Sequence, residues 1–137
     1  MNRKARKLTR SLRILIVDNR HWQCREIERK LNLQGYYRIA PLRQLNELKA
    51  VVENALSPID LVLVHHEISH DPDFDLWAYC LSNPIIRHFI IYADPQACDT
   101  AAPLRPTRVT IALSTAPGKE ELTRVMRVVE QGVQRFS

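Results

Sequence analysis

Groups that could bind a metal or move a proton are concentrated in one polar stretch near the middle of the chain. The stretch contains His65, His66, Glu67, His70, Asp71, Asp73 and Asp75. Imidazole and carboxylate ligands together suit Zn²⁺, Ni²⁺ or Cu²⁺, and an unperturbed imidazole titrates near pH 6.5, which would allow pH sensing. The alternating aspartates are spaced as in a calcium loop, but the glycine and the terminal glutamate of that motif are missing. We therefore expect them in a solvated loop and a helix start.

This polar stretch directly follows the apolar run Asp60–His65, which is typical of a strand buried on both faces of a sheet. In open α/β sheets, functional groups collect at the carboxyl ends of the strands. Successive strand residues point to opposite faces, so His65 and His66 are not expected to share one tight metal site. We expect a neutral, hydrogen-bonded His65 and no bound metal. A site built from His65, His70 and Asp18 is the metal-binding alternative.

Apolar periodicity places further elements on both sides of this run. Other strands are predicted at 13–17, 36–41, 89–93 and 109–113, and helices at 21–33, 42–56, 74–81 and 119–136. Trp22 is expected on the apolar stripe of the first helix and Leu56 on that of the second. Prolines within 94–106 leave room for one short or irregular fourth helix at most. This alternation predicts an α/β fold with a five-stranded parallel sheet and helices on both faces.

Basic residues are concentrated at the start of the chain. Residues 1–13 carry six basic side chains and no acidic one, whereas the rest carries 14 basic and 15 acidic side chains. We expect a flexible basic arm at 1–12 and one domain at 13–137. Such an arm could contact phosphate backbones or an acidic membrane surface. No apolar run is long enough to span a bilayer and no secretory signal is recognisable, so a cytoplasmic location is expected.

The motifs of common enzymes are missing from the sequence. It contains no nucleophile elbow, no H-E-x-x-H and no phosphate-cradling glycine loop, and it has only three glycines. Its three cysteines, Cys24, Cys80 and Cys98, are far apart and form no C-x-x-C, which favours reduced, packed thiols. We therefore expect neither catalytic residues nor a cofactor.

In their order and spacing, the predicted elements resemble the receiver domain of bacterial two-component response regulators, which has a flavodoxin-like fold. The resemblance covers residues 12–135 and is carried by four segments: Ile14–Asn19 at the first strand, Asp60–His65 at the acceptor strand, Phe89–Ala93 at the fourth strand, and Lys119–Leu122 at the start of the last helix. The end of that helix, Val128–Gly132, is similar to the receivers of NarL-type transcription regulators. In those proteins a DNA-binding helix-turn-helix follows the receiver.

The resemblance also implies where a phosphorylation site would be, and this chain departs from the family pattern there. His65 stands where the family has its phospho-acceptor aspartate, and Asp18–Asn19 stand where it has an acidic pair that holds Mg²⁺. Ala93 replaces the hydroxyl residue of the fourth strand, although a shift of one residue would offer the bulkier Tyr92. The remaining departures are Thr115, or Ser114 in another alignment, in place of the phosphate-binding lysine, and Ala112 in place of the aromatic switch residue.

These departures predict a phosphorylation-independent pseudo-receiver that acts in signal transduction or transcription regulation through protein–protein contact. It could form a homodimer through the fifth strand and the last helix. Nucleic acid would be reached only by a DNA-binding domain that is missing from this chain or by the basic arm. The alternative is a metal- or small-ligand-responsive sensor whose site is the former phosphate pocket around Asp18, His65, Ala93 and Thr115.

Overall fold

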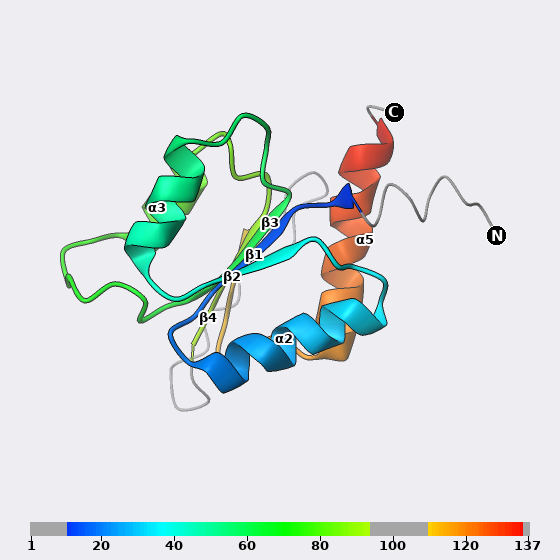
Figure 1. Ribbon diagram of the computed structural model, residues 1–137, viewed down its shortest axis with the longest axis horizontal. Helices are drawn as coiled ribbons and strands as arrows, with labels where there is room; N and C mark the ends of the chain where they lie inside the picture. Colours follow the sequence, from blue (N-terminus) through cyan, green and yellow to red (C-terminus); the bar gives the residue numbers. More distant parts are fainter. Residues whose placement is uncertain (1–10, 94–109, 136–137) are drawn as a thin grey trace.

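The computed structural model describes residues 11–93 and 110–135, and the side chains of 110 and 132–135 are not part of that description. Strands and helices alternate along the chain (Figure 1). The strands are β1 (Ile14–Val17), β2 (Ile39–Leu42), β3 (Leu61–His65), β4 (Phe89–Tyr92) and β5 (Thr110–Leu113). The helices of the described residues are α2 (His21–Leu33), α3 (Leu45–Glu53), α4 (Leu76–Ser82) and α5 (Lys119–Arg135).

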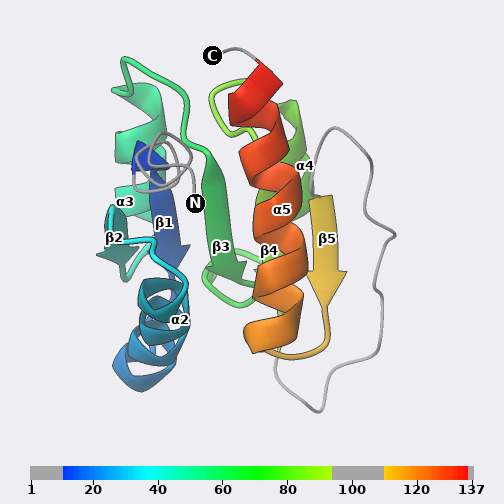
Figure 2. The same ribbon diagram turned by 90° about the vertical axis from the view of Figure 1, so that its right-hand side faces the viewer.

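The five strands form one all-parallel sheet in the order β2-β1-β3-β4-β5. This is the strand order of flavodoxin-like doubly wound folds. Helices α2 and α5 cover one face of the sheet, and α3 and α4 cover the other (Figures 1 and 2). The predicted α/β fold with a parallel five-stranded sheet is therefore confirmed.

The central strand β3 contributes to two separate cores because its side chains alternate between the faces. Leu61 and Leu63 pack with α2 and α5, whereas Val62 and Val64 pack with α3 and α4. All five residues of β3 are buried. The continuous apolar run of the sequence is thus explained by a strand that has a helical layer on each side.

Two side chains that were expected in the core are exposed. Trp22 is 62% exposed because it lies beside the buried stripe of α2, and Gln23 is buried instead. Leu56 is fully exposed because α3 ends at Glu53, three residues earlier than predicted. The Asn54 side chain donates a hydrogen bond to the Ala50 carbonyl at this helix end.

The segment around the second strand also differs from the prediction. Tyr36 was expected in the strand, but it lies before β2 and is buried in the core. Gly35 precedes it with φ +96°, a conformation that favours glycine and turns the chain out of α2. Helix α3 begins at Leu45 and not at residue 42, because Glu47 accepts hydrogen bonds from the backbone N–H groups of Arg43 and Gln44.

Strand β2 forms one edge of the sheet. The carbonyl groups of Arg38 and Leu42 accept hydrogen bonds from the backbone N–H groups of Ile14 and Asp18, so the even-numbered residues of β2 direct their backbone groups inward. Pro41, between them, has its nitrogen on the outer side of the edge, and a proline nitrogen carries no hydrogen there.

Several expectations fall at the limits of the described residues. The short or irregular fourth helix and the basic residues 1–10 lie outside them. Leu12 is only 2% exposed and belongs to the core that packs against α2 and α5. In the described part of the chain, no helix is long and apolar enough to cross a membrane.

Candidate functional site

Three polar side chains meet at the carboxyl edge of the sheet, where all five strands end on the same side (Figure 2). Asp18 follows β1, His65 ends β3 and Tyr92 ends β4. The register pairs Val17 with Val64 and His65 with Tyr92, so the three residues lie at nearly the same level on neighbouring strands. The three are almost completely buried.

The Asp18 carboxylate is surrounded by hydrogen-bond donors. Its Oδ1 accepts bonds from the Arg20 backbone N–H at 2.9 Å and from Arg20 Nε at 3.1 Å. Its Oδ2 accepts bonds from Arg20 Nη2 at 3.1 Å and from the Tyr92 hydroxyl at 2.8 Å. Arg20 therefore binds the carboxylate in a bidentate manner through Nε and Nη2, and bidentate contacts are among the strong forms of this ion pair.

Arg20 connects this buried carboxylate to the surface. Its side chain is 26% exposed, whereas that of Asp18 is 0% exposed. The guanidinium carbon also lies 5.5 Å from the ring centre of the exposed Trp22, at a distance typical of a cation–π contact. The charge that compensates Asp18 thus comes from a residue two positions along the same loop. Arg20 was not predicted as a site residue from the sequence, although a basic residue two positions after Asp18 was the available signal.

Tyr92 fills the space beside Asp18 with a neutral hydroxyl group. Burial raises the pKa of the Tyr92 hydroxyl strongly, and the negative charge of Asp18 and the hydrogen bond to it raise it further. The hydroxyl therefore stays protonated and remains a donor to Asp18. The receiver resemblance places Tyr92 at this position only with a shift of one residue in the alignment.

His65 is buried at 4% relative exposure, and its ring centre lies 5.7 Å from that of Tyr92. Its neighbour His66 is exposed, and His66 Nε2 lies 3.5 Å from a carboxylate oxygen of Glu67. Within the described residues, no buried side-chain nitrogen or oxygen lacks a hydrogen-bond partner. The carboxyl end of β3 therefore presents a packed imidazole at the place where the receiver resemblance implies an acceptor carboxylate.

The remaining expected positions contribute no ionised group to this edge. Ala93 is half-buried, and its backbone N–H donates to the Leu113 carbonyl. Thr115 is exposed and donates its hydroxyl proton to the carbonyl of Ala116. Asn19 is exposed and lines a different cavity, described below.

The three candidate metal ligands do not form an open site. Both carboxylate oxygens of Asp18 already accept hydrogen bonds, and His70 is exposed in the loop after β3. Among the described residues, no group of three histidine, cysteine, aspartate or glutamate side chains is arranged to hold a metal.

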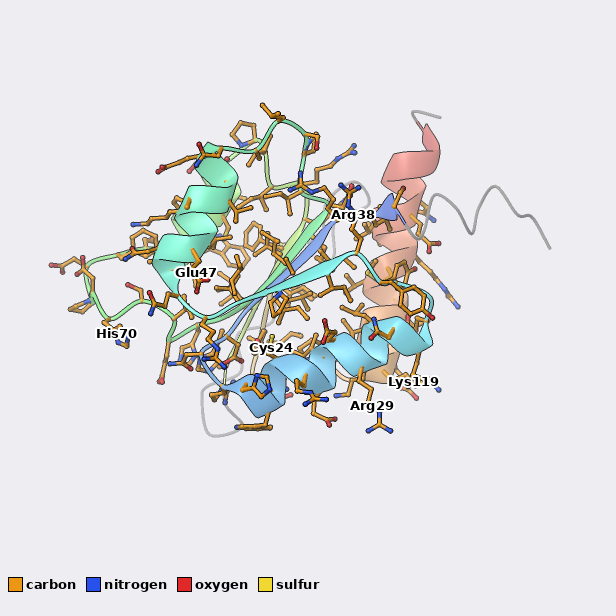
Figure 3. All side chains as sticks on the ribbon, in the orientation of Figure 1. Cys24, Arg29, Arg38, Glu47, His70 and Lys119 are labelled. Atoms are coloured by element: carbon orange, nitrogen blue, oxygen red, sulfur yellow. The ribbon has the colours of Figure 1, made fainter. Side chains whose placement is uncertain are left out.

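Two cavities open near this edge. One, of about 450 Å³, lies between α2 and β2 and includes Asp18, Cys24 and Arg43 in its lining. Cys24 lies on α2, on its side toward the sheet (Figure 3). Burial, helped by Asp18 and Glu28, raises the pKa of its thiol to about 11, which makes it a poor nucleophile at neutral pH. Cys24 and Cys80 are both buried, as predicted, and neither forms a disulfide bond, whereas Cys98 lies outside the described residues.

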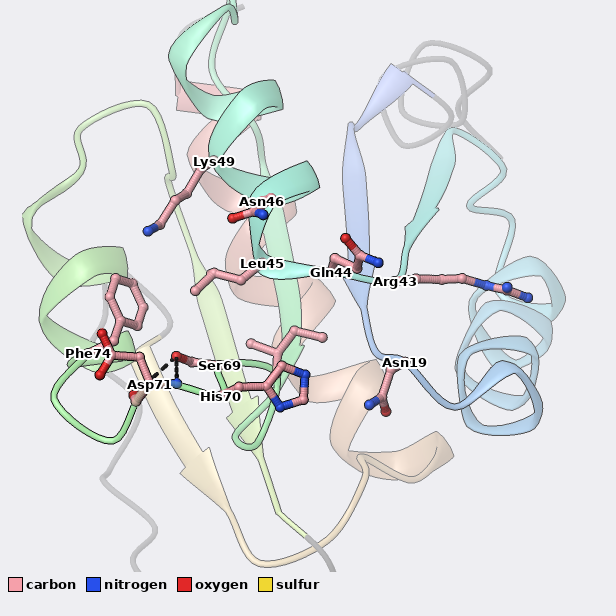
Figure 4. A pocket seen from close by; sticks show the side chains of 11 residues that line it. Asn19, Arg43, Gln44, Leu45, Asn46, Lys49, Ser69, His70, Asp71 and Phe74 are labelled. Atoms are coloured by element: carbon pink, nitrogen blue, oxygen red, sulfur yellow. Dashed lines mark hydrogen bonds between the residues drawn. The ribbon is translucent and has the colours of Figure 1, made fainter.

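The other cavity has a volume of about 670 Å³ and lies on the opposite side of the edge, between the start of α3 and the loop after β3 (Figure 4). We call it the α3 groove. Its lining residues are Asn19, Arg43, Gln44, Leu45, Asn46, Lys49, Ile68, Ser69, His70, Asp71 and Phe74.

Comparisons of this chain with protein-family models, with curated proteins and with solved structures find no match.

Proposed function

We propose that this chain is a receiver-like signalling domain that works without phosphorylation and acts through contact with a protein partner. The observation that carries the proposal is the occupied Asp18 carboxylate. Arg20 and Tyr92 take up both of its oxygens, at the sheet edge where the receiver resemblance implies a magnesium site.

Phosphoryl transfer to a receiver requires a carboxylate nucleophile and a dication that neutralises charge on the phosphoryl oxygens. The first requirement is unmet because an imidazole, His65, stands where the receiver resemblance implies the acceptor, and an imidazole cannot form an acyl phosphate. The second is opposed because the guanidinium of Arg20 already compensates the charge of Asp18. A dication entering here would meet a fixed positive charge and only one formal anion.

A domain whose sheet edge cannot be phosphorylated would signal by binding a partner at its surface and not by a covalent change at that edge. In this proposal the partner is a protein, and the face formed by β5 and α5 is the candidate surface for self-association. Arg124 and Arg127 of α5 are exposed.

Incubation with acetyl phosphate and Mg²⁺, followed by intact-mass measurement, tests the proposal. We expect no added phosphoryl mass under conditions in which a functional receiver domain, treated in parallel, is modified. A hydroxylamine-sensitive phosphoryl adduct on the wild-type chain, lost on Asp18→Asn, would show an acyl phosphate and would refute the proposal.

Sedimentation velocity tests the proposed self-association separately. If the β5–α5 face forms a dimer, the mass should approach that of a monomer when Arg124→Glu and Arg127→Glu are combined. The matched pair Arg25→Glu and Arg29→Glu changes the same charge on α2 and should leave the mass unchanged. A wild-type chain that is monomeric at high concentration would exclude this interface.

A further inference from the structure

The α3 groove lies where the chain reverses its direction of travel across the sheet. From β1 the chain moves outward to β2, and from β3 it moves the other way to β4. Asn19 follows β1, while residues 68–71 follow β3, so the groove spans these two strand ends. Ligands of doubly wound folds bind at this kind of position, and a volume of about 670 Å³ is within the range of small-molecule sites.

One half of the groove combines an apolar surface with a positive charge. Leu45, Phe74 and the buried Ile68 supply the apolar surface. The Lys49 ammonium lies 4.6 Å from the ring centre of Phe74. Figure 4 shows Leu45, Lys49 and Phe74 around the same part of the groove.

Lys49 has no acidic partner in the part of the chain that the structure describes. Asp71 is the acidic residue of the lining, and its carboxylate accepts a hydrogen bond from the Asp73 backbone at 2.9 Å within its own loop. The lining also includes Arg43. The Arg43 side chain points away from Lys49 and Phe74 (Figure 4), so Lys49 is the cation beside the apolar surface, and its lack of an acidic partner there favours an anionic ligand.

The other half of the groove offers neutral hydrogen-bonding groups. The side chains of Asn19 and His70 face each other across it, and Asn46 lies above the apolar part (Figure 4). None of these three side chains makes a hydrogen bond within residues 11–93 and 110–135. They are available to a bound molecule, and a few polar groups around an apolar surface are what fix orientation in small-molecule sites.

We propose that the α3 groove binds a small organic carboxylate with an apolar body. The carboxylate pairs with the Lys49 ammonium, the apolar body lies on Leu45, Ile68 and Phe74, and the far end reaches Asn19 or His70. Asp18 does not line this groove. The site is therefore separate from the Asp18 carboxylate and its partners, and the inference holds whether or not the chain is phosphorylated.

Two-dimensional ¹H–¹⁵N NMR titration of the full chain tests this site. The probes are indole-3-acetate and phenylacetate, each compared with its neutral primary amide. We expect saturable shifts of backbone signals in 45–49 and 68–74 with at least one carboxylate, and binding weaker by about tenfold or more for the amide, since a charge-assisted contact is lost.

Three variants locate the charge and the apolar surface. Lys49→Gln and Phe74→Leu should each weaken carboxylate binding several-fold while keeping the chemical-shift pattern of the folded protein. Lys119→Gln is the matched control, because Lys119 is exposed at the start of α5, on the other face of the sheet (Figure 3). Three outcomes would each overturn the proposal. The first is that neither carboxylate gives saturable shifts at millimolar concentration, the second is that acid and amide bind with equal affinity, and the third is that Lys49→Gln binds the carboxylate as tightly as the wild-type chain does.

Discussion

At the scale of single residues, the main feature of the sheet edge is the buried carboxylate of Asp18, which forms an ion pair with Arg20 of the same loop. Asp18 is 1% exposed, and an ionised carboxylate at such a position needs a positive charge and several hydrogen bonds. Arg20 provides the charge and Tyr92 provides a neutral donor. The hydrogen bond from Tyr92 connects the carboxyl end of β4 to the loop after β1.

Removing Arg20 tests this arrangement. Arg20→Ala leaves a buried carboxylate without its cation, and we expect a loss of about 2–3 kcal/mol in the free energy of unfolding, below the fully buried case because Arg20 is partly exposed. Urea denaturation at pH 7 measures the loss. Arg29→Ala, an exposed arginine of α2, is the control and should change stability by less than about 0.5 kcal/mol (Figure 3). Equal effects of the two variants would contradict the ion pair.

Tyr92 and Tyr36 predict a loss of stability in alkaline solution. Burial raises the pKa of both hydroxyls, and each donates a hydrogen bond to a carboxylate, of Asp18 and Glu130 respectively. The folded chain therefore retains protons that the unfolded chain releases above about pH 10, so their stabilising contribution is complete below that pH and declines above it. Each tyrosine should contribute a decline of about 1.4 kcal/mol per pH unit.

Urea denaturation between pH 9 and pH 12 measures this decline. In Tyr92→Phe the free energy of unfolding should decline less steeply with pH, by the contribution of one tyrosine. At neutral pH this free energy should fall by about 1.5–3 kcal/mol, because a hydrogen bond to a charged group is lost. Tyr37→Phe is the control, since Tyr37 is exposed. An unchanged alkaline slope in Tyr92→Phe would contradict a buried, protonated hydroxyl.

The sequence could predict which positions surround this edge, but not how they are connected. Asp18 and His65 were placed at strand ends because an apolar run stops abruptly before each polar residue. The roles of Arg20 and Tyr92 depend on side-chain conformation and on the register between β3 and β4. Neither quantity is encoded in periodicity, so the partners of Asp18 required the structure.

At the scale of elements, strands β1, β3 and β4 followed the sequence pattern more closely than helix α3 did. Strands β1, β3 and β4 are continuous apolar runs and were predicted within two residues. Helix α3 was predicted too long at both ends, because its limits are set by polar contacts of Glu47 and Asn54 and not by apolar spacing. Trp22 was misplaced for a related reason, since a one-residue offset on a helix moves a side chain by about 100°.

Helix α4 shows what the aspartate-rich loop does. Asp75 is the N-cap of α4, and its Oδ1 accepts a hydrogen bond from the Ala78 backbone N–H at 3.0 Å. We expect Asp75→Ala to lower the free energy of unfolding by about 1 kcal/mol, while Asp75→Ser should retain most of it. Chemical denaturation is the measurement.

Asp73→Ala provides the matched control two residues earlier. The Asp73 carboxylate is exposed and accepts no hydrogen bond within the described residues, so this change should be nearly neutral. If Asp73→Ala were as harmful as Asp75→Ala, or if added Ca²⁺ raised the melting temperature of the wild-type chain, the loop would have a role other than capping α4.

At the scale of the whole molecule, the core extends to the beginning of the described residues. The sequence predicted a flexible arm through residue 12, whereas Leu12 is 2% exposed in the core beneath α2 and α5. The charge pattern locates the basic residues well, but it does not show where packing starts, because one leucine among basic residues carries little periodic signal.

Truncation and point mutation separate the arm from the core. We expect Leu12→Ala to cost about 2–3 kcal/mol of unfolding free energy, since it leaves a cavity in a buried cluster. Deletion of residues 1–10 should change the same quantity by less than about 0.5 kcal/mol, because it removes none of the core side chains that the structure describes. Thermal and urea denaturation measure both. A deletion as harmful as Leu12→Ala would place structural contacts in the arm.

The position of Pro41 has a consequence for how these molecules behave when they are crowded. An unprotected edge strand is a template on which another chain can add a strand, and repeated addition leads to fibrils. Because the outward nitrogen of Pro41 cannot donate, an incoming strand at β2 would meet a gap in the ladder after one or two bonds. Pro41→Val would restore the missing donor and, without altering the core, would make this edge prone to cross-chain assembly.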